Sequence, residues 1–563
     1  MDLAAELRAF LPADRVRTRP IDRVAYASDA SVYRRVPAAV VLPRDVEEIR
    51  SLLRLGRRLR IPLTFRAAGT SLSGQAVSDG ILVVVATPDW RGIELLDGGS
   101  RVRVEPGAIG GDVNRQLAPY GVKLGPDPAS IDACTIGGIL ANNSSGMCCG
   151  VEQNAYRTLE SISFVLADGR QFDTGRPAAR EAFVREAPEL AHGLVELKRR
   201  VEGNAVLRER IRRKYAMKNT MGYSLNALCD FSDPLDILAH LLIGSEGTLA
   251  FIAGAVLRTI PDPPLKSCGL LLFADVPRAC GAIAALRESG ARTLELMDRA
   301  SLRSVEDQPG VPPGLRDLPE TAAALLVEYQ CGGEQELGGR ERALHALLPS
   351  LSLLDEPQLT REPDARARLW RVRKGIIPTV GAMRPRGTSC IIEDVVFPVE
   401  RLAQGVGELQ RLIADHGYDD VAVFGHAKDG NLHFVLTQAF DGAAEIERYD
   451  RFMQQLARLV AVRHGGALKA EHGTGRNMAP FVETEWGPEA YAVMRALKHL
   501  VDPDGLLNPG VLLDDAPRAH VEQLKSLPAI EPEVDACIEC GFCERMCPSR
   551  DLTLTPRQRT RNR

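Results

Sequence analysis

Short apolar runs that open directly into glycine-rich segments recur through the first half of this 563-residue chain. The run at residues 61–65 leads into RAAGTSLSGQ at residues 66–75, and TIGGILANNSSG and GSEGTL follow at residues 135–146 and 244–249. Glycine has no side chain, so such segments let the backbone approach a large flat ligand closely. The pattern predicts an α+β fold in which short strands and loops surround a ligand of this kind.

No nucleotide-binding motif accompanies these loops. A G-x-G-x-x-G sequence between a strand and a helix is absent, as is a Walker A sequence, so neither NAD nor ATP is indicated. Residues 66–75 can instead turn successive backbone N–H groups and hydroxyls toward a diphosphate. The loop alone is a weak signal, because a plain surface turn has a similar composition. The segments GPDP at residues 125–128 and KNTMGY at residues 218–223 strengthen it.

The composition is that of a globular protein, with 45% hydrophobic and 26% charged residues and a net charge of −4. Because the chain carries no basic excess, we expect no nucleic-acid partner. The charged residues Asp2, Glu6 and Arg8 are unlike a secretory signal. The longest apolar runs fall far short of the roughly 18 residues that span a bilayer. These features predict a cytoplasmic protein.

Prolines and charge mark the domain boundaries. Pro261, Pro263 and Pro264 end a region whose strand–turn rhythm predicts few long helices. Beyond them, helical spacing at residues 278–288, 399–416 and 445–463 alternates with strands. The predicted parts are an N-terminal segment (1–35), a cofactor-binding domain (36–263), an α+β domain (264–512), a linker (513–532) and a cysteine-containing module (533–563).

Two histidines flank a predicted hairpin. The apolar runs at residues 421–426 and 432–436 enclose an Asp-Gly turn, which is typical of a hairpin and places His426 near His433. Paired imidazoles suit a divalent metal such as zinc, and Glu471 can supply a third, carboxylate ligand. Each histidine alone is more often structural. The pair together with EHGTG at residues 471–475 favours a metal site.

Four of the twelve cysteines lie close together, in the spacing C-x2-C-x2-C-x3-C-P that is typical of bacterial [4Fe–4S] ferredoxins. They are Cys537, Cys540, Cys543 and Cys547. A zinc knuckle fits less well, because zinc sites use pairs of ligands at longer separation. The chain has no second run of this kind. Either Cys547 closes a lone cluster, or the polypeptide is a truncated piece of a longer one, which would leave the cluster incomplete or absent; we favour truncation.

Several motifs in a fixed order carry a resemblance to a known family: RAAGTSLSGQA, LGPDPAS, GGILANNSSGMCCG, GSEGTL, IIEDVVFPVERL and LKAEHGTGRNMAPFVE. From about residue 20 onward the chain resembles the FAD-linked D-2-hydroxy-acid dehydrogenases of the vanillyl-alcohol oxidase/p-cresol methylhydroxylase (PCMH) fold. It looks most like the NAD-independent D-lactate dehydrogenases that carry a C-terminal iron–sulfur module. The resemblance implies a PCMH-type FAD-binding domain, an FAD-linked oxidase C-terminal α+β domain and the start of a ferredoxin-like iron–sulfur module.

The resemblance also implies site residues. His472 would be the catalytic base, Arg373 would bind the substrate carboxylate as a planar fork, and His426, His433 and Glu471 would hold the divalent metal. Glu471 and His472 are adjacent, so in an extended segment their side chains diverge, one toward the metal and one toward the substrate. The expected FAD-binding residues are Arg66, Ala67, Ala68, Gly69, Thr70, Ser71, Leu72, Ser73, Gly74, Pro126, Asp127, Thr135, Gly137, Gly138, Asn142, Ser144, Ser145, Gly146, Glu246, Gly247 and Asn508.

The implied activity is NAD-independent oxidation of a small D-2-hydroxy acid, with D-lactate to pyruvate as the first choice. Electrons would pass through the iron–sulfur module to a quinone or cytochrome. The missing iron–sulfur region or subunit would be a partner. The protein would contact the inner face of the membrane peripherally. Relatives that use dicarboxylates have a lysine where this chain has Ile392, and without that lysine a second carboxylate lacks a partner. A small monocarboxylate such as D-lactate is therefore favoured over D-2-hydroxyglutarate, which stays an alternative, as does glycolate.

Two further classes remain alternatives. A non-catalytic flavin/iron–sulfur electron-transfer subunit would have no reason to keep a base such as His472. A metal hydrolase would carry the histidine–glutamate cluster without flavin motifs.

Overall fold

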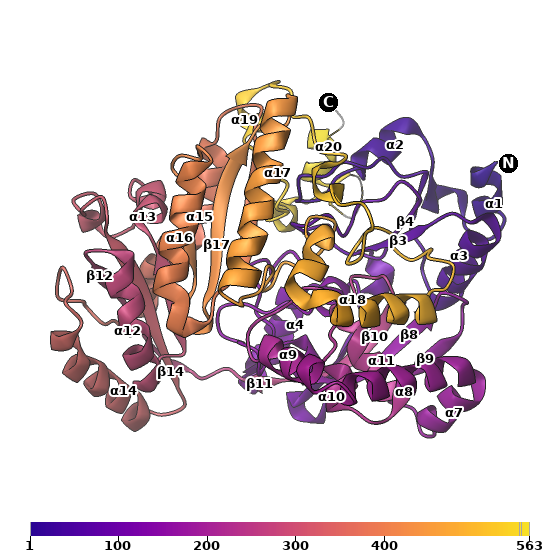
Figure 1. Cartoon of the computed structure of the whole chain (residues 1–563), viewed down its shortest axis with the longest axis horizontal. Helices are drawn as coiled ribbons and strands as arrows, with labels where there is room; N and C mark the ends of the chain where they lie inside the picture. Colours follow the sequence, from indigo (N-terminus) through magenta and orange to yellow (C-terminus); the bar gives the residue numbers. More distant parts are fainter. Residues whose placement is uncertain (1, 551, 553, 562–563) are drawn as a thin grey trace. The chain divides into compact units, whose positions relative to one another are not determined.

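A computed structural model describes residues 2–550, 552 and 554–561, and the chain divides into two compact units (Figure 1). Unit 1 consists of residues 1–260, 471–525 and 539–563, and unit 2 of residues 261–470 and 526–538. Pro261, Pro263 and Pro264 lie at or just after the first division between the units. Residues 471–525 differ from the prediction, because they pack in unit 1 and not with residues 264–470.

Unit 1 begins with a small sheet in the order β1-β2-β4-β3, in which β2, β4 and β3 are parallel. The helix α3 (Val46–Leu59) follows β2, and the side chain of Asp45 accepts a hydrogen bond from the backbone N–H of Glu48, as the capping spacing predicts. Leu52 and Leu53 of α3 pack into a hydrophobic core with these strands. The strand bounds are β1 (Val16–Arg17), β2 (Ala39–Val41), β3 (Leu63–Arg66) and β4 (Ile81–Val84). Residues 66–75 leave this sheet at the end of β3.

A second sheet of unit 1 is antiparallel, in the order β5-β6-β10-β8-β9. Its strands are β5 (Ile93–Leu96), β6 (Arg101–Val104), β8 (Leu159–Leu166), β9 (Gln171–Asp173) and β10 (Ala250–Arg258). The short helices α4 (Gly110–Leu117), α5 (Ile136–Asn142) and α6 (Ala155–Thr158) lie between β6 and β8 in the chain.

The expectation of few long helices before residue 260 is wrong. Five helices connect β9 to β10: α7 (Ala179–Glu186), α8 (Pro188–Glu202), α9 (Ala205–Tyr215), α10 (Ala227–Asp230) and α11 (Pro234–Leu242). In α8 the residues Leu190, Leu194, Leu197 and Val201 are buried. They recur at helical spacing and so hold one face of α8 against the unit.

Unit 2 contains one antiparallel sheet in the order β12-β14-β13-β16-β17-β15. Its strands are β12 (Leu265–Phe273), β13 (Thr293–Met297), β14 (Ala323–Cys331), β15 (Ser389–Val396), β16 (Ala422–His426) and β17 (Asn431–Gln438). The helices are α12 (Val276–Glu288), α13 (Arg299–Val305), α14 (Glu334–Leu347), α15 (Pro363–Met383), α16 (Leu402–Asp415) and α17 (Ala443–Ala457). The predicted α+β fold and its helix positions are confirmed.

The remaining elements are short or lie toward the two ends of the chain. They are α1 (Leu3–Arg8), α2 (Pro20–Ala25), β7 (Val122–Lys123), β11 (Ile260–Pro261), α18 (Val482–Val501), α19 (Pro532–Asp535) and α20 (Pro556–Arg561). Within the described part of the chain, no helix has both the length and the apolar character that crossing a bilayer requires.

Candidate active site

The segment EHGTG at residues 471–475 lies inside unit 1, where several of the predicted cofactor segments contact it. The Gln75 side-chain amide donates a hydrogen bond of 2.7 Å to the carbonyl of His472. The backbone N–H of Gly475 donates to Glu246 Oε2 over 2.8 Å, and that of Gly473 donates to Thr220 Oγ1 over 3.1 Å. The predicted base is therefore part of the same unit as the predicted cofactor loops.

Gly473 shows how closely these segments meet. It has φ +78°, and a Cβ atom there would lie 2.3 Å from side-chain oxygens of both Asn142 and Glu246. No other residue fits this position without displacing a neighbour, so packing requires glycine at residue 473, the first of the two glycines of EHGTG.

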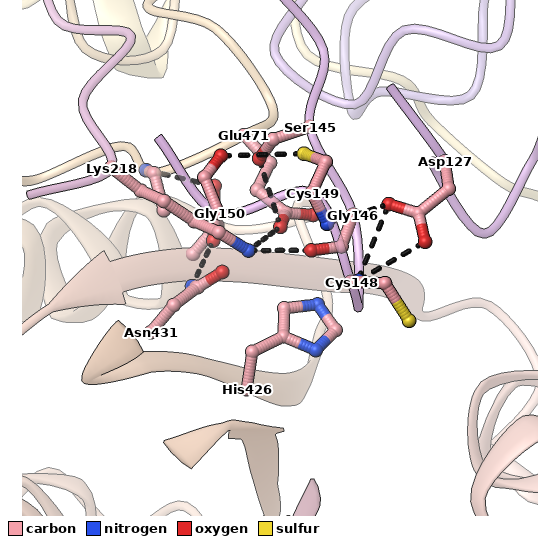
Figure 2. Close-up of polar contacts among 12 residues, drawn as sticks. Asp127, Ser145, Gly146, Cys148, Cys149, Gly150, Lys218, His426, Asn431 and Glu471 are labelled. Atoms are coloured by element: carbon pink, nitrogen blue, oxygen red, sulfur yellow. Dashed lines mark hydrogen bonds and ion pairs between the residues drawn. The ribbon is translucent and has the colours of Figure 1, made fainter. Parts of the chain in front are cut away.

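The carboxylate of Glu471 is held by a buried cation. Lys218 Nζ lies 2.7 Å from Glu471 Oε1, and the same amine donates to the carbonyl of Gly146 over 2.6 Å (Figure 2). Ser145 Oγ donates to Glu471 Oε1 over 3.1 Å. The Lys218 side chain is 1% exposed, so this ion pair has little solvent to screen it.

The predicted phosphate loop is anchored at both ends by hydrogen bonds. Arg66 is buried, and its guanidinium donates to the carbonyls of Tyr26 and Ala76. It therefore connects the start of the loop to the residue that follows its end. Gly69 has φ +65°, and a Cβ atom there would meet the Arg66 guanidinium at 2.4 Å. Arg66 is thus a residue that shapes the loop.

A second cation lies behind the loop. The backbone N–H of Arg476 donates to the carbonyl of Ser73 over 2.8 Å. Burial of its guanidinium lowers the pKa of Arg476 to about 10, which leaves the group charged at neutral pH. The backbone of Arg476 therefore holds the Ser73 end of the loop, while its guanidinium donates to the carbonyl of Pro509.

Asn508 links two of the predicted cofactor segments to β3. Its side-chain amide donates to the carbonyls of Gln75 and Glu246, and its oxygen accepts from Thr64 Oγ1. Together with the contacts of EHGTG, this buried side chain holds residues 471–525 in unit 1. The prediction that Asn508 belongs with the cofactor loops is consistent with these contacts.

Other predicted cofactor residues of unit 1 are held by local contacts. Asp127 accepts hydrogen bonds from the backbone N–H groups of Cys148 and Cys149 (Figure 2). Asn142 donates to Ser144 Oγ over 3.0 Å. A Cβ atom on Gly138 would lie 3.3 Å from the Cβ of Ala67, so α5 approaches the phosphate loop directly.

Among the residues that the structure describes, two buried hydroxyls of these segments have no hydrogen-bond partner, Ser73 Oγ and Thr135 Oγ1. Buried polar groups are almost always hydrogen-bonded, so these two point to a ligand with polar atoms. A cavity of about 320 Å³ adjoins the loop, and its lining includes Arg66, Ala67, Ala68 and Thr135. The residues present in unit 1 therefore fit a large phosphate-bearing cofactor such as FAD.

The β16–β17 hairpin of unit 2 confirms the predicted closeness of its histidines. Their Nε2 atoms lie 3.3 Å apart, and both side chains are buried. Nδ1 of His426 lies 2.7 Å from Glu295 Oε1, and Nδ1 of His433 lies 3.4 Å from Asp394 Oδ1. Each ring thus turns Nδ1 toward a carboxylate and Nε2 toward the other ring.

This geometry fits a divalent metal. Two nitrogens held about 2.1 Å from one zinc ion at a tetrahedral angle are about 3.4 Å apart, close to the observed spacing. A carboxylate that accepts the Nδ1 proton is the usual outer partner of a metal-binding histidine. The backbone N–H of Ala470 donates to Asp394 Oδ2 over 3.0 Å, so the chain enters Glu471 from a residue fixed beside this carboxylate.

Arg373, on α15, is part of the same network in unit 2. Its Nε donates to Glu295 Oε2 over 2.7 Å, and its guanidinium lies 4.5 Å from the centre of the Phe424 ring. The arginine is 7% exposed. Since Nε is engaged by Glu295, the Nη1 and Nη2 groups remain as the fork for a carboxylate.

The predicted cluster cysteines belong to a segment that the two units share. Cys540, Cys543 and Cys547 belong to unit 1, and Cys537 belongs to unit 2. No described cysteine forms a disulfide. Hydrogen bonding with Ser549 lowers the pKa of the Cys547 thiol, which favours the thiolate that a cluster ligand requires.

Several residues of these networks were not predicted from the sequence. Lys218 begins the segment KNTMGY at residues 218–223, which was predicted to approach the cofactor only because of its glycine. Glu295 and Asp394 lie in mostly apolar strands, and a charge in such a strand needs a buried partner. That mismatch is the signal that could have found them.

Comparisons with known proteins agree with this geometry. The family described as "FAD binding domain" matches residues 37–175, and "FAD linked oxidases, C-terminal domain" matches residues 262–512. Together the two families match more than half of the chain.

Among curated relatives, glycolate oxidase subunit GlcD of Escherichia coli (strain K12) is 28% identical over 90% of this chain and 89% of that protein. GlcD of Bacillus subtilis is 26% identical over 89% of this chain and 94% of that protein. D-2-hydroxyglutarate dehydrogenase of Escherichia coli (strain K12) is 28% identical over 94% of this chain and 55% of that protein.

Two solved structures share the fold. The chain superimposes on p-cresol methylhydroxylase with a TM-score of 0.63 and 15% identity, covering 91% of this chain and 96% of that one. Alkyldihydroxyacetonephosphate synthase gives a TM-score of 0.61 at 16% identity, covering 90% of this chain and 84% of that one. The predicted order of a PCMH-type domain followed by an oxidase C-terminal domain is confirmed.

Proposed function

Because the chain belongs to the FAD-linked oxidases and has a PCMH-type FAD-binding domain, we propose that it oxidises a small 2-hydroxy acid to the 2-oxo acid. The observation that carries the proposal is the buried pair of His426 and His433, whose Nε2 atoms face each other. Nδ1 of His426 lies 2.7 Å and Nδ1 of His433 lies 3.4 Å from a carboxylate oxygen. Glycolate oxidase and D-2-hydroxyglutarate dehydrogenase, to which the chain is similar, are both named for acids of this class.

The oxidation removes a hydride and a proton from the substrate. FAD, when bound, accepts the hydride from the substrate Cα. We assign the hydroxyl proton to a ring nitrogen of His472, which follows Glu471 in the segment held by Gln75, Glu246 and Thr220. A fixed imidazole is suited to this transfer because it exchanges a proton near neutral pH.

Arg373 is the proposed anchor for the substrate carboxylate. Its Nη1 and Nη2 groups form a planar fork, and Glu295 and Phe424 hold the guanidinium in one orientation. A cation that is oriented before the substrate binds loses little freedom on binding. Arg373 therefore positions the acid with its carboxylate fixed.

We assign a divalent-metal site to His426, His433 and Glu471. A metal such as zinc, when bound, supplies a Lewis acid. Glu295 and Asp394 hold the two rings with Nε2 available to it. Lys218 and Ser145 orient the Glu471 carboxylate, and Lys218 supplies the positive charge that balances it without metal.

The preferred substrate is D-lactate, with glycolate as the second candidate. Ile392 is buried on β15, and the neighbouring Glu393 pairs with Lys469, where both side chains are fully buried. Neither position offers a free cation for a second carboxylate, which favours monocarboxylic acids over D-2-hydroxyglutarate. Glycolate stays a candidate because the relatives include glycolate oxidase subunits.

The cysteine segment is proposed to accept electrons from the flavin. Cys537, Cys540, Cys543 and Cys547 have the spacing of a [4Fe–4S] site. A quinone or a cytochrome, reached from the cytoplasmic face of a membrane, is the proposed acceptor. A further iron–sulfur region or subunit would complete this route.

The test is anaerobic reduction of the bound flavin by a panel of acids. We expect D-lactate to bleach the yellow absorbance faster than glycolate, and L-lactate and D-2-hydroxyglutarate to bleach it little. Faster bleaching by D-2-hydroxyglutarate would overturn the choice of a monocarboxylate. No bleaching by any 2-hydroxy acid would overturn the proposed function.

A further inference from the structure

The C-terminal segment, which the structure describes at residues 539–550, 552 and 554–561, contributes to the lining of the cavity beside the phosphate loop. It belongs to unit 1 with the loop itself. The cavity of about 320 Å³ is lined by Arg66, Ala67 and Ala68 on one side and by C-terminal residues including Arg550 and Arg557 on the other. The position of this segment does not follow from its cysteine spacing.

Arg557 joins the segment to the loop. Its Nη2 donates to the carbonyl of Ala68 over 2.6 Å, and its Nη1 donates to the carbonyl of Gly69 over 2.8 Å. Its Nε donates to Glu544 Oε1 over 2.7 Å. The side chain is 4% exposed, so one buried guanidinium connects two carbonyls of the loop to a carboxylate of its own segment.

The segment is held in place by other contacts as well. Leu554 packs against a small core that contains Tyr26 and Val84, and Arg545 pairs with Asp132 over 2.9 Å. A Cβ atom on Gly541 would lie 3.4 Å from Thr70 Cγ2 and 3.2 Å from the Arg557 guanidinium. The cysteine-bearing turn therefore lies directly against the phosphate loop.

The charge of the cavity indicates the kind of ligand. Seven arginines line it, against four carboxylates. Three of the arginines come from the C-terminal segment: Arg545, Arg550 and Arg557. A partly enclosed space with an excess of guanidinium groups binds phosphate-type anions, because these groups offer charge and paired donors together.

We propose that residues 539–561 are a strap that completes the FAD site of this chain, and that Arg550 and Arg557 stabilise the cofactor's diphosphate there. Arg557 acts by holding the carbonyls of Ala68 and Gly69, which turns the neighbouring N–H groups of the loop toward the cavity. Arg550 adds charge to the cavity wall. This inference rests on the FAD-binding domain and not on the proposed substrate.

The test compares the affinity of the full-length apoprotein for FAD and for riboflavin, measured by quenching of flavin fluorescence. We expect Arg557→Ala to raise the Kd for FAD by about tenfold or more, as loss of charge-assisted hydrogen bonds does. Arg550→Ala should raise it less. Riboflavin has no phosphate, so its Kd should change little in either variant. Arg212→Ala is the control, because Arg212 lies on α9 in an exposed pair with Glu209.

A second measurement needs no variant and so does not depend on how Arg557→Ala folds. Hydrogen exchange of residues 539–561 in the unmodified protein should slow when FAD is added. Equal FAD affinity in Arg557→Ala and Arg212→Ala would overturn the strap, as would exchange in this segment that does not respond to FAD. If FAD binds as expected but no 2-hydroxy acid reduces it, the proposed substrate fails and the strap stands.

Discussion

Glu295 Oε1 lies 2.7 Å from Nδ1 of His426, and the other oxygen of this fully buried carboxylate accepts a hydrogen bond from Arg373. One side chain on β13 thus orients both a proposed metal ligand and the proposed substrate anchor. Register explains the contact, since Glu295 is paired directly with His426 across β13 and β16.

Replacing this carboxylate should weaken metal binding. Glu295→Gln offers only one acceptor oxygen for two donors, so the orientation of His426 becomes less defined. Loss of such a partner typically lowers metal affinity by about 10–100-fold. Zinc affinity measured by competition with a chelator tests this. Glu306→Gln is the matched control, because Glu306 pairs with Arg299 in the same unit. Equal zinc affinity in the two variants would argue against the role of Glu295.

Arg373→Lys should raise the KM for the 2-hydroxy acid more than it lowers kcat. Lysine keeps the charge but loses the planar fork and the hydrogen bond to Glu295. Steady-state kinetics on D-lactate, with Arg371→Ala as the exposed neighbour on the same helix, provide the comparison. Arg373→Ala removes the charge as well as the fork. If its kcat/KM equals that of the unmodified enzyme, Arg373 does not bind the substrate.

Much of the arrangement could be predicted from local sequence. The hairpin that pairs His426 with His433 follows from two apolar runs around an Asp-Gly turn, and the α3 cap follows from Asp45 and Glu48. The helices at residues 179–242 were not predicted. Leu190, Leu194 and Leu197 have helical spacing, but the glycine-rich strand–turn pattern on both sides favoured few long helices in this region.

Contacts between distant parts of the chain could not be predicted in the same way. Nothing near Asn508 in the sequence shows that its amide bonds to Gln75 and Glu246, more than 250 residues away in each case. The same holds for Arg557 and the carbonyls of Ala68 and Gly69. Such pairs depend on how the loops pack, and local periodicity carries no information about that.

Lys218→Met should destabilise the protein through Glu471. The pair is buried, and removal of one partner leaves an uncompensated carboxylate, at a cost of about 3–5 kcal/mol. Thermal unfolding in the absence of metal should show a lower Tm, and the double variant Lys218→Met/Glu471→Gln should recover part of it. Arg212→Met, which breaks an exposed pair, should change the Tm little. A double variant no more stable than Lys218→Met would contradict the coupling.

Cys540→Ser should lower the iron and sulfide content of protein reconstituted under anaerobic conditions. The reason is that cubane clusters are held by thiolates, and serine is a poor substitute. Cys229→Ser, which alters a cysteine of α10 outside the run, is the control. If the unmodified protein takes up no more iron than Cys540→Ser, the cluster assignment is wrong.

The central claim is that the flavin and His472 take the hydride and the proton separately. It is tested by the rate of flavin reduction after rapid anaerobic mixing of D-lactate with FAD-loaded His472→Gln. The account predicts unchanged FAD content and a reduction rate lower by about 10²–10⁴-fold, as loss of a general base produces. A reduction rate equal to that of the unmodified enzyme would contradict it.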